Sequence, residues 1–173
     1  MYHFFSEHEH IHDTYIDIVG SDVNHIKNVL RLKTGDSLLI SSGDNIDYTC
    51  HIAQIDEEHI RADIDSVDER GRELASKIYL FQGLPKADKM ELVIQKAVEL
   101  GAFEVIPVAM KRSVVKLDAK KAESKVKRWN AIAESAAKQS KRSILPQVSD
   151  VVTFAQAVKM AENCQIKLLP YEC

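Results

Sequence analysis

"GLPKADKMELVIQKAVELGAFEVIPV", residues 83–108, decides the fold of this chain because it joins a turn, a helix and a buried strand. The run "KIYLFQGL" before it predicts a first strand, and residues 88–100 predict a helix that ends at Gly101. The apolar run "FEVIPVAM" that follows predicts a second strand. A strand, a helix and a strand in this order favour an α/β fold with a mostly parallel sheet.

The rest of the C-terminal half continues this alternation. Residues 118–140 predict a long helix, because apolar side chains recur on one face around Trp129. After Pro146, residues 154–161 predict a further helix, and "IKLLPYEC" at 166–173 predicts a final strand. We therefore expect helices on both faces of the sheet.

The N-terminal half has a different periodicity of apolar residues. Residues 36–67 alternate polar and apolar side chains, and Gly, Asp and Asn residues at 43–45 and acidic residues at 56–58 mark turns. This pattern predicts an antiparallel meander in a small β-barrel. The stretch 21–35 before it predicts a short helical insertion. Its apolar face is expected to hold Val23, Ile26, Val29 and Leu30.

Charge divides the chain in the same way. Apolar residues make up 45% and charged residues 28%, which is ordinary for a globular protein and excludes a disordered chain. Residues 1–76 hold 6 Lys/Arg against 16 Asp/Glu, and residues 77–173 hold 17 against 10. The contrast favours two domains, 1–72 and 73–173, with the basic one as the candidate to face a polyanion. Two merely solvated surfaces stay open as the alternative.

The cysteines and the N-terminus bear on the cellular compartment. Cys50, Cys164 and Cys173 form no CxxC or zinc pattern, so reduced thiols are the simplest interpretation. The start, "MYHFFSEHEH", lacks a basic and then apolar leader, and no stretch approaches the ~20 apolar residues of a membrane span. We therefore expect a cytoplasmic protein without a membrane partner.

The turn at 83–89 is a candidate anion site. Gly83 and Lys86 precede the start of a helix, where free backbone amides attract anions. The turn lacks the G-x-x-x-x-G-K-[ST] and G-x-G-x-x-G patterns of nucleotide-binding proteins. It does lie beyond the carboxyl end of a strand, where ligands of open α/β sheets bind. An ordinary strand-to-helix turn stays open as the alternative.

Residues 111–142 are strongly basic, with 11 Lys/Arg against 3 Asp/Glu. Lys121, Lys125 and Arg128 recur at helical spacing on the face away from Trp129. Such a row of cations suits the phosphate backbone of a nucleic acid. A solvated helix face is the alternative interpretation.

Signals for covalent or metal chemistry are weak. No Ser-His-Asp set or activated cysteine stands out, so the catalytic residues stay unknown. His8, His10 and His12 alternate, but histidines near a chain terminus are usually solvated, and we expect no metal site.

The order of these signals resembles one family, the RsmE-type small-subunit rRNA uridine-N3 methyltransferases of the SPOUT class. The resemblance covers nearly the whole chain and depends on the combination of its motifs. The matching pieces are "HFF" at 3–5, "HIKNVLRLKTGD" at 25–36, "GLPKADKMELVIQKAVELG" at 83–101, "IPV" at 106–108, "RSVVK" at 112–116 and "RWNAIAESAAKQSKRSILP" at 128–146.

This resemblance implies a PUA-like, RNA-binding β-barrel at 1–72 and a SPOUT methyltransferase domain at 73–173. It implies S-adenosyl-L-methionine as the cofactor, bound in a trefoil knot that also forms a homodimer. The implied reaction methylates N3 of one uridine in the decoding region of 16S rRNA, in the assembled small ribosomal subunit. It calls for no metal, no DNA and no membrane.

The resemblance also suggests site residues, carried over motif by motif. Those expected to contact RNA or the target uridine are Arg31, Lys86, Lys89, Arg112, Lys127, Arg128, Gln139 and Arg142. Those expected to approach the cofactor are Leu169, Pro170, Tyr171 and Glu172.

Three features depart from the family pattern. His3 stands where relatives often have Arg, and Lys111 stands where an acidic residue is expected. No Gly-Pro-Glu-Gly-Gly-like segment follows before Cys173, so we expect the knot to lie outside this chain and the chain alone to be inactive.

Two alternatives from other functional classes stay open. One is a non-catalytic rRNA-binding module, or an inactive fragment of such an enzyme. The other is a small-metabolite α/β enzyme, which would need a pair of catalytic groups that the sequence does not display.

Overall fold

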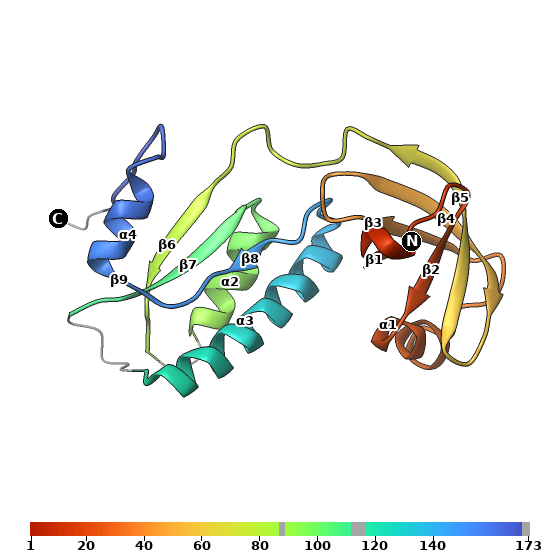
Figure 1. The fold of residues 1–173 in the computed structure, drawn as a ribbon, viewed down its shortest axis with the longest axis horizontal. Helices are drawn as coiled ribbons and strands as arrows, with labels where there is room; N and C mark the ends of the chain where they lie inside the picture. Colours follow the sequence, from red (N-terminus) through yellow and green to blue (C-terminus); the bar gives the residue numbers. More distant parts are fainter. Residues whose placement is uncertain (87–88, 112–116, 171–173) are drawn as a thin grey trace. The chain divides into compact units, whose positions relative to one another are not determined.

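The computed structural model describes residues 1–86, 89–111 and 117–170, in two compact units (Figure 1). The first unit is Met1–Ser76 with Glu134–Leu145, and the second is Lys77–Ala133 with Pro146–Cys173. The segment Glu134–Leu145 thus packs with the N-terminal residues, although it lies within the predicted domain 73–173.

The first unit is built on a curled five-stranded sheet with the strand order β1-β3-β4-β5-β2. All neighbours are antiparallel except β1 and β3, which are parallel. This sheet contains the predicted meander, which is confirmed. The strands are β1 (Tyr2–Phe5), β2 (Tyr15–Val19), β3 (Ser37–Ser41), β4 (Asp47–Ile55) and β5 (His59–Asp68).

The curl and the core of this sheet have local causes. The register of β4 against β5 shifts between Thr49 and Cys50 and again between Ile52 and Gln54, and such bulges bend a strand and increase its twist. The β3–β4 turn uses positive φ angles at Gly43 and Asn45. The concave side buries apolar residues from the strands and the helical insertion, among them Phe4, Ile16, Val23, Ile26, Leu38, Ile40, Ile52 and Ile60.

The helical insertion consists of α1 (Ser21–Asn24) and a π-type turn, η2 (His25–Val29). Leu30 N–H donates to the carbonyl of His25, five residues back, which widens the turn. Val29 is consequently 64% exposed, so its predicted place on the buried face was wrong. Val23 and Ile26 are buried as predicted.

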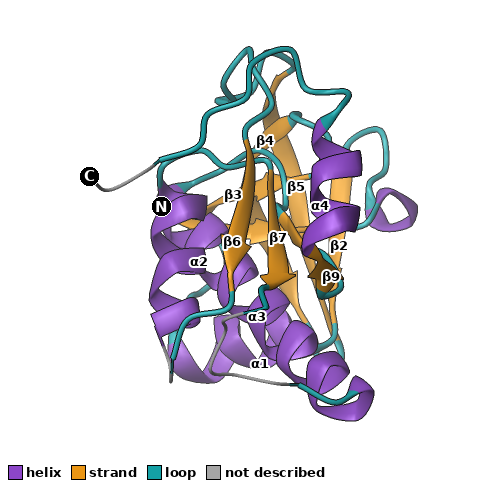
Figure 2. Ribbon diagram, turned by 90° about the vertical axis from the view of Figure 1, so that its left-hand side faces the viewer, coloured by secondary structure: helices purple, strands orange, loops and turns teal. Residues whose placement is uncertain are grey.

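The second unit contains the predicted parallel sheet, in the order β6-β7-β8, with β9 also paired to β7. Figures 1 and 2 show α2 and α4 on opposite sides of β6 and β7, so helices cover both faces as expected. The elements are β6 (Tyr79–Gly83), α2 (Lys89–Glu99), β7 (Glu104–Ala109), α3 (Ala119–Ser140), β8 (Gln147–Val148), β9 (Val152–Thr153) and α4 (Phe154–Ala161).

Local sequence explains where these helices begin and what they bury. Met90, Ile94 and Val98, four residues apart, form the buried face of α2. A capping box starts α4, because the side chains of Thr153 and Gln156 each bind the other's backbone. Trp129 lies on the buried stripe of α3, as predicted.

The predicted final strand is wrong for residues 166–170, and residues 171–173 lie outside the described structure. A strand needs a neighbour for its backbone hydrogen bonds, and no strand in the described ranges pairs with 166–170. Leu169 is 89% exposed, so the apolar residues of this stretch cover no core. Among the helices that the structure describes, none has the length and apolar character to cross a membrane.

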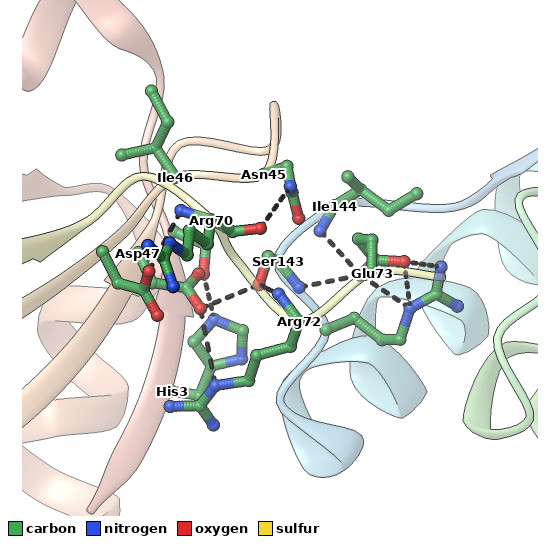
Figure 3. Close-up of polar contacts among 12 residues, drawn as sticks. His3, Asn45, Ile46, Asp47, Arg70, Arg72, Glu73, Ser143 and Ile144 are labelled. Atoms are coloured by element: carbon green, nitrogen blue, oxygen red, sulfur yellow. Dashed lines mark hydrogen bonds and ion pairs between the residues drawn. The ribbon is translucent and has the colours of Figure 1, made fainter. Parts of the chain in front are cut away.

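A buried ion pair holds the chain after α3 within the first unit. The guanidinium of Arg142, 7% exposed, donates from Nε to both carboxylate oxygens of Glu73, at 2.9 and 3.0 Å. The same carboxylate accepts the backbone N–H groups of Ser143 and Ile144 (Figure 3). Glu73 therefore fixes both the charge and the backbone of this segment.

A second carboxylate, that of Asp47, is 2% exposed and is joined to this segment through Ser143 (Figure 3). It accepts the hydroxyls of Ser41 at 2.5 Å and Ser143 at 2.7 Å, and Arg72 Nε lies 3.6 Å away. Because the Ser41 hydroxyl donates to Asp47, its oxygen is left to accept from His3 Nε2, at 2.7 Å. The network ties β1, β3 and β4 to the chain after α3.

We expect Arg142→Met to lower the free energy of unfolding by about 3–5 kcal/mol, because it leaves the largely buried Glu73 carboxylate without its cation. Urea denaturation would measure this loss. The control is Gln139→Ala, at an exposed position in the same segment, which should change stability by about 0.5 kcal/mol or less. Equal effects of the two substitutions would contradict the structural role of Arg142.

Burial lowers the pKa of His3 below its ordinary value of 6.5, against the opposing effect of Asp47. The unfolded chain then binds a proton more readily than the folded chain, so stability contributed by neutral His3 is lost as pH falls through 6.5. We expect the urea midpoint of the wild type to fall more steeply between pH 8 and pH 5 than that of His3→Gln. Parallel pH profiles would refute this assignment.

Candidate functional site

The carboxyl end of β6 leads directly into the candidate turn. Leu84 and Pro85 follow the strand, the side chains of Lys86 and Lys89 are exposed, and α2 begins at Lys89. Strands β6 and β7 are parallel, so both end at this edge of the sheet. The structure thus places two of the predicted RNA contacts at the edge where α/β sheets bind ligands.

A small pocket lies at this edge, within the second unit. It is formed by the chain after β6, the first turn of α2 and the first half of α3. Its lining residues are Leu84, Pro85, Met90, Glu91, Leu117, Lys125 and Trp129. Sequence analysis identified Lys125 as one cation of the helix but did not identify Glu91, which carries no motif of its own.

The exposed face of α3 carries Lys121, Lys127 and Arg128 of the predicted cations. Lys125 is half-buried and lines the pocket together with Trp129, four residues on, so its predicted place on the opposite face was wrong. Arg128 is 63% exposed and donates from Nη2 to Glu91 Oε2 at 2.9 Å, so part of its charge is compensated. Lys127 is exposed, and in the described ranges no carboxylate forms an ion pair with it. Lys121 pairs with Asp118 in a solvated pair of little strength. Lys127 is therefore available to a phosphate.

The other predicted RNA contacts belong to the first unit. Gln139 and Arg31 are exposed, and Arg31 has φ of 55°, a left-handed conformation that is uncommon outside glycine and recurs at functional sites. Arg142 is buried against Glu73, which does not favour contact with RNA because that contact would break the ion pair. No motif in the sequence marked Glu73 as the partner of Arg142, because the two residues lie 69 positions apart.

Several predicted residues cannot be placed in a site. Arg112, Tyr171 and Glu172 lie outside the described residues. Leu169 and Pro170 are exposed in irregular chain and meet no partner surface among the described residues. The described structure therefore brings together Lys86, Lys89, Lys127 and Arg128 in one unit, and Arg31, Gln139 and Arg142 in the other.

The histidines and cysteines offer little chemistry. His8 and His12 lie 3.3 Å from the carboxylates of Asp44 and Asp17. His10 groups with the exposed Glu7 and Glu9, an arrangement common without a metal. Burial raises the pKa of the Cys50 thiol to about 12, which removes it as a nucleophile.

Two family models match this chain. An RNA methyltransferase domain matches residues 72–173, and an RNA methyltransferase PUA domain matches residues 18–65. Ribosomal RNA small subunit methyltransferase E of Bacillus subtilis is 40% identical over 155 residues, which are 90% of this chain and 60% of that protein. The chain thus spans less than two thirds of the length of this relative.

Solved structures agree with these matches. A ribosomal RNA small subunit methyltransferase E from Neisseria gonorrhoeae, bound to S-adenosyl methionine, has a TM-score of 0.81 at 27% identity, covering 91% of this chain and 64% of that one. A putative methyltransferase from Legionella pneumophila, in complex with the bound cofactor SAM, has a TM-score of 0.83 at 30% identity, covering 96% and 68%.

The residues that the family models match correspond to elements of both units. The PUA model spans the helical insertion and most of the curled sheet, and the methyltransferase model begins one residue before Glu73 and spans the parallel sheet. The resemblance seen in the sequence motifs is confirmed by these matches. The chain belongs to the family of RNA methyltransferases that includes the ribosomal RNA small subunit methyltransferase E proteins. It contains that family's PUA and methyltransferase domains.

Proposed function

We propose that this chain belongs to an S-adenosyl-L-methionine-dependent enzyme that methylates N3 of a uridine in small-subunit rRNA. The observation that carries the proposal is the match of the RNA methyltransferase domain to residues 72–173. The names of the relatives supply the class of substrate and the solved structures supply the cofactor. The exposed lysines at the strand edge are compatible with an anionic substrate.

The finer parts of the proposal concern the target and the assembly. The proposed target is the decoding-region uridine of 16S rRNA in the assembled small subunit, with a homodimer as the active assembly and the cytoplasm as its compartment. The proposed domains are a PUA-like RNA-binding domain at 1–72 and a SPOUT domain at 73–173. Relatives named for the small-subunit rRNA support the class of RNA.

The chemistry needs an anion to be stabilised. N3 of uracil carries a proton and must lose it before its lone pair can attack a methyl group, and the negative charge then spreads to the neighbouring carbonyl oxygens. Cations held near the base stabilise that anion without a metal. Lys86 and Lys89 are exposed cations at the carboxyl edge, and we propose that they bind the RNA phosphates or this anion.

S-adenosyl-L-methionine would supply an activated methyl group. Leu169 and Pro170, the two predicted cofactor contacts that the structure describes, are exposed. This observation favours, as a second candidate, an rRNA-binding module without a cofactor. Calorimetric titration of the chain with the cofactor separates the candidates when it is read together with methyl transfer.

The direct test is methyl transfer to small subunits that lack the modification. The proteins to compare are the 173-residue chain and a chimera extended with the remaining segment of the Bacillus subtilis relative. A methyl group on N3 blocks base pairing, so primer extension should stop at the target after incubation with the chimera. The absence of a stop with either protein, in the presence of a positive control from the relative, would overturn the enzymatic proposal.

RNA binding gives a second prediction. We expect Lys127→Gln to weaken binding of small-subunit rRNA and to reduce the slope of log K against log salt by about 0.7–1, because one phosphate contact is lost. Filter binding over a salt series measures both. Lys96→Gln is the matched control, because Lys96 pairs with Glu99 at the far end of α2. The same slope for wild type and Lys127→Gln would exclude Lys127 from the interface.

A further inference from the structure

Two residues that line the pocket at the carboxyl edge, Trp129 and Glu91, carry buried polar atoms that need an explanation. Among the described residues, neither Trp129 Nε1 nor Glu91 Oε1 has a hydrogen-bond partner. Trp129 is only 3% exposed, so solvent at the surface does not satisfy its N–H group. Buried polar groups without partners cost stability and are rare in native proteins, which indicates that something binds them.

The two atoms have fixed and opposite roles. The indole N–H of Trp129 can only donate a hydrogen bond. The other oxygen of Glu91, Oε2, accepts from Arg128 at 2.9 Å, which leaves Oε1 as an acceptor without a partner among the described residues. Lys125 lines the same pocket and adds a positive charge. The pocket thus offers one donor, one acceptor and one cation.

The size and the walls limit the ligand. The cavity volume is about 30 Å³, which suits a group of one or two heavy atoms and is too small for a nucleobase. The remaining wall is apolar and consists of Leu84, Pro85, Met90 and Leu117. A suitable ligand therefore presents a small group that both accepts and donates a hydrogen bond, on an apolar carbon frame next to a negative charge.

A ribose 2′-hydroxyl meets each of these requirements. Its oxygen accepts one hydrogen bond and its O–H group donates another, the sugar carbons are apolar, and a phosphate follows at the neighbouring position. DNA lacks this hydroxyl, so a site that binds it distinguishes RNA from DNA. An ordered water would satisfy the same two atoms, but it would give no preference between the two nucleic acids.

We propose that this pocket binds a ribose 2′-hydroxyl of the RNA substrate, accepting its O–H at Glu91 and donating to its oxygen from Trp129. Lys125 then neutralises the adjoining phosphate. The site rests on the proposed function only in requiring that the ligand is RNA. One hydroxyl group then accounts for both unpaired atoms. The site also allows the carboxyl edge of the sheet to select RNA over DNA.

The test compares the affinities of the chain for a short oligouridylate and for the oligodeoxyuridylate of the same length, by fluorescence anisotropy at fixed salt. We expect wild type to bind the RNA about tenfold more tightly, the factor that one pair of well-placed hydrogen bonds gives. Trp129→Phe removes the donor. Glu91→Gln turns an amide N–H toward the pocket, because Arg128 requires the amide oxygen. Each should lower the ratio to below about twofold.

Controls separate this effect from loss of structure. Trp129 packs in the core, so thermal unfolding is measured for each variant, and Glu91→Gln keeps the test valid if Trp129→Phe does not fold. Glu99→Gln, on the same helix and bonded to Lys96, should keep the wild-type ratio. A 2′-fluoro oligonucleotide cannot donate, so it should bind wild type as DNA does and be insensitive to Glu91→Gln.

The outcomes also separate this site from the enzymatic proposal. An unchanged ratio in Glu91→Gln and Trp129→Phe would mean that only water fills the pocket, and the inference would be overturned. The same conclusion would follow if wild type bound RNA and DNA equally while the chimera still methylated rRNA. A pocket-dependent preference without methyl transfer would instead keep the site and remove the enzymatic proposal.

Discussion

The largely buried carboxylate of Glu73, 12% exposed, is the constraint on which the first unit depends. It lies just after the curled sheet in the chain, and it accepts hydrogen bonds from the guanidinium of Arg142 and from two backbone N–H groups beyond α3. A buried carboxylate is costly unless its oxygens are satisfied, so the segment that satisfies them must fold with it. This requirement explains why the segment Glu134–Leu145 belongs to the first unit.

The opposite charges of the two halves of the sequence also form ion pairs inside the protein. The cations of the basic stretch 111–142 do not form a single group, because Lys138 and Arg142 meet acidic partners within the first unit. Lys138 binds Asp22 at 3.1 Å, and Arg142 binds Glu73. Earlier on the helix, Lys127 is exposed. One basic stretch of sequence therefore provides both internal ion pairs and charge for an external partner.

In the proposed RNA interface, the strand edge of the second unit combines recognition elements of different kinds. Its exposed lysines would attract the RNA phosphates in a way that depends little on geometry. The pocket beside them holds a donor and an acceptor in fixed positions, because Trp129 is packed in the core and Glu91 is held by Arg128. Charge gives affinity and fixed hydrogen bonds give discrimination, so the two features serve one interface in complementary ways.

The sequence by itself determined the order of most helices and strands, and its motifs determined the family, because periodicity, turn residues and caps are local properties. It failed at 166–170, where an apolar run has no neighbouring strand among the described residues, and at Val29, where a π-type turn changes the exposed face. Only the tertiary structure decided that Arg142 pairs with Glu73, 69 residues away. It also placed Glu91 and Trp129 around one pocket. Burial and pairing depend on residues that are distant in the chain, so a pattern among sequence neighbours does not predict them.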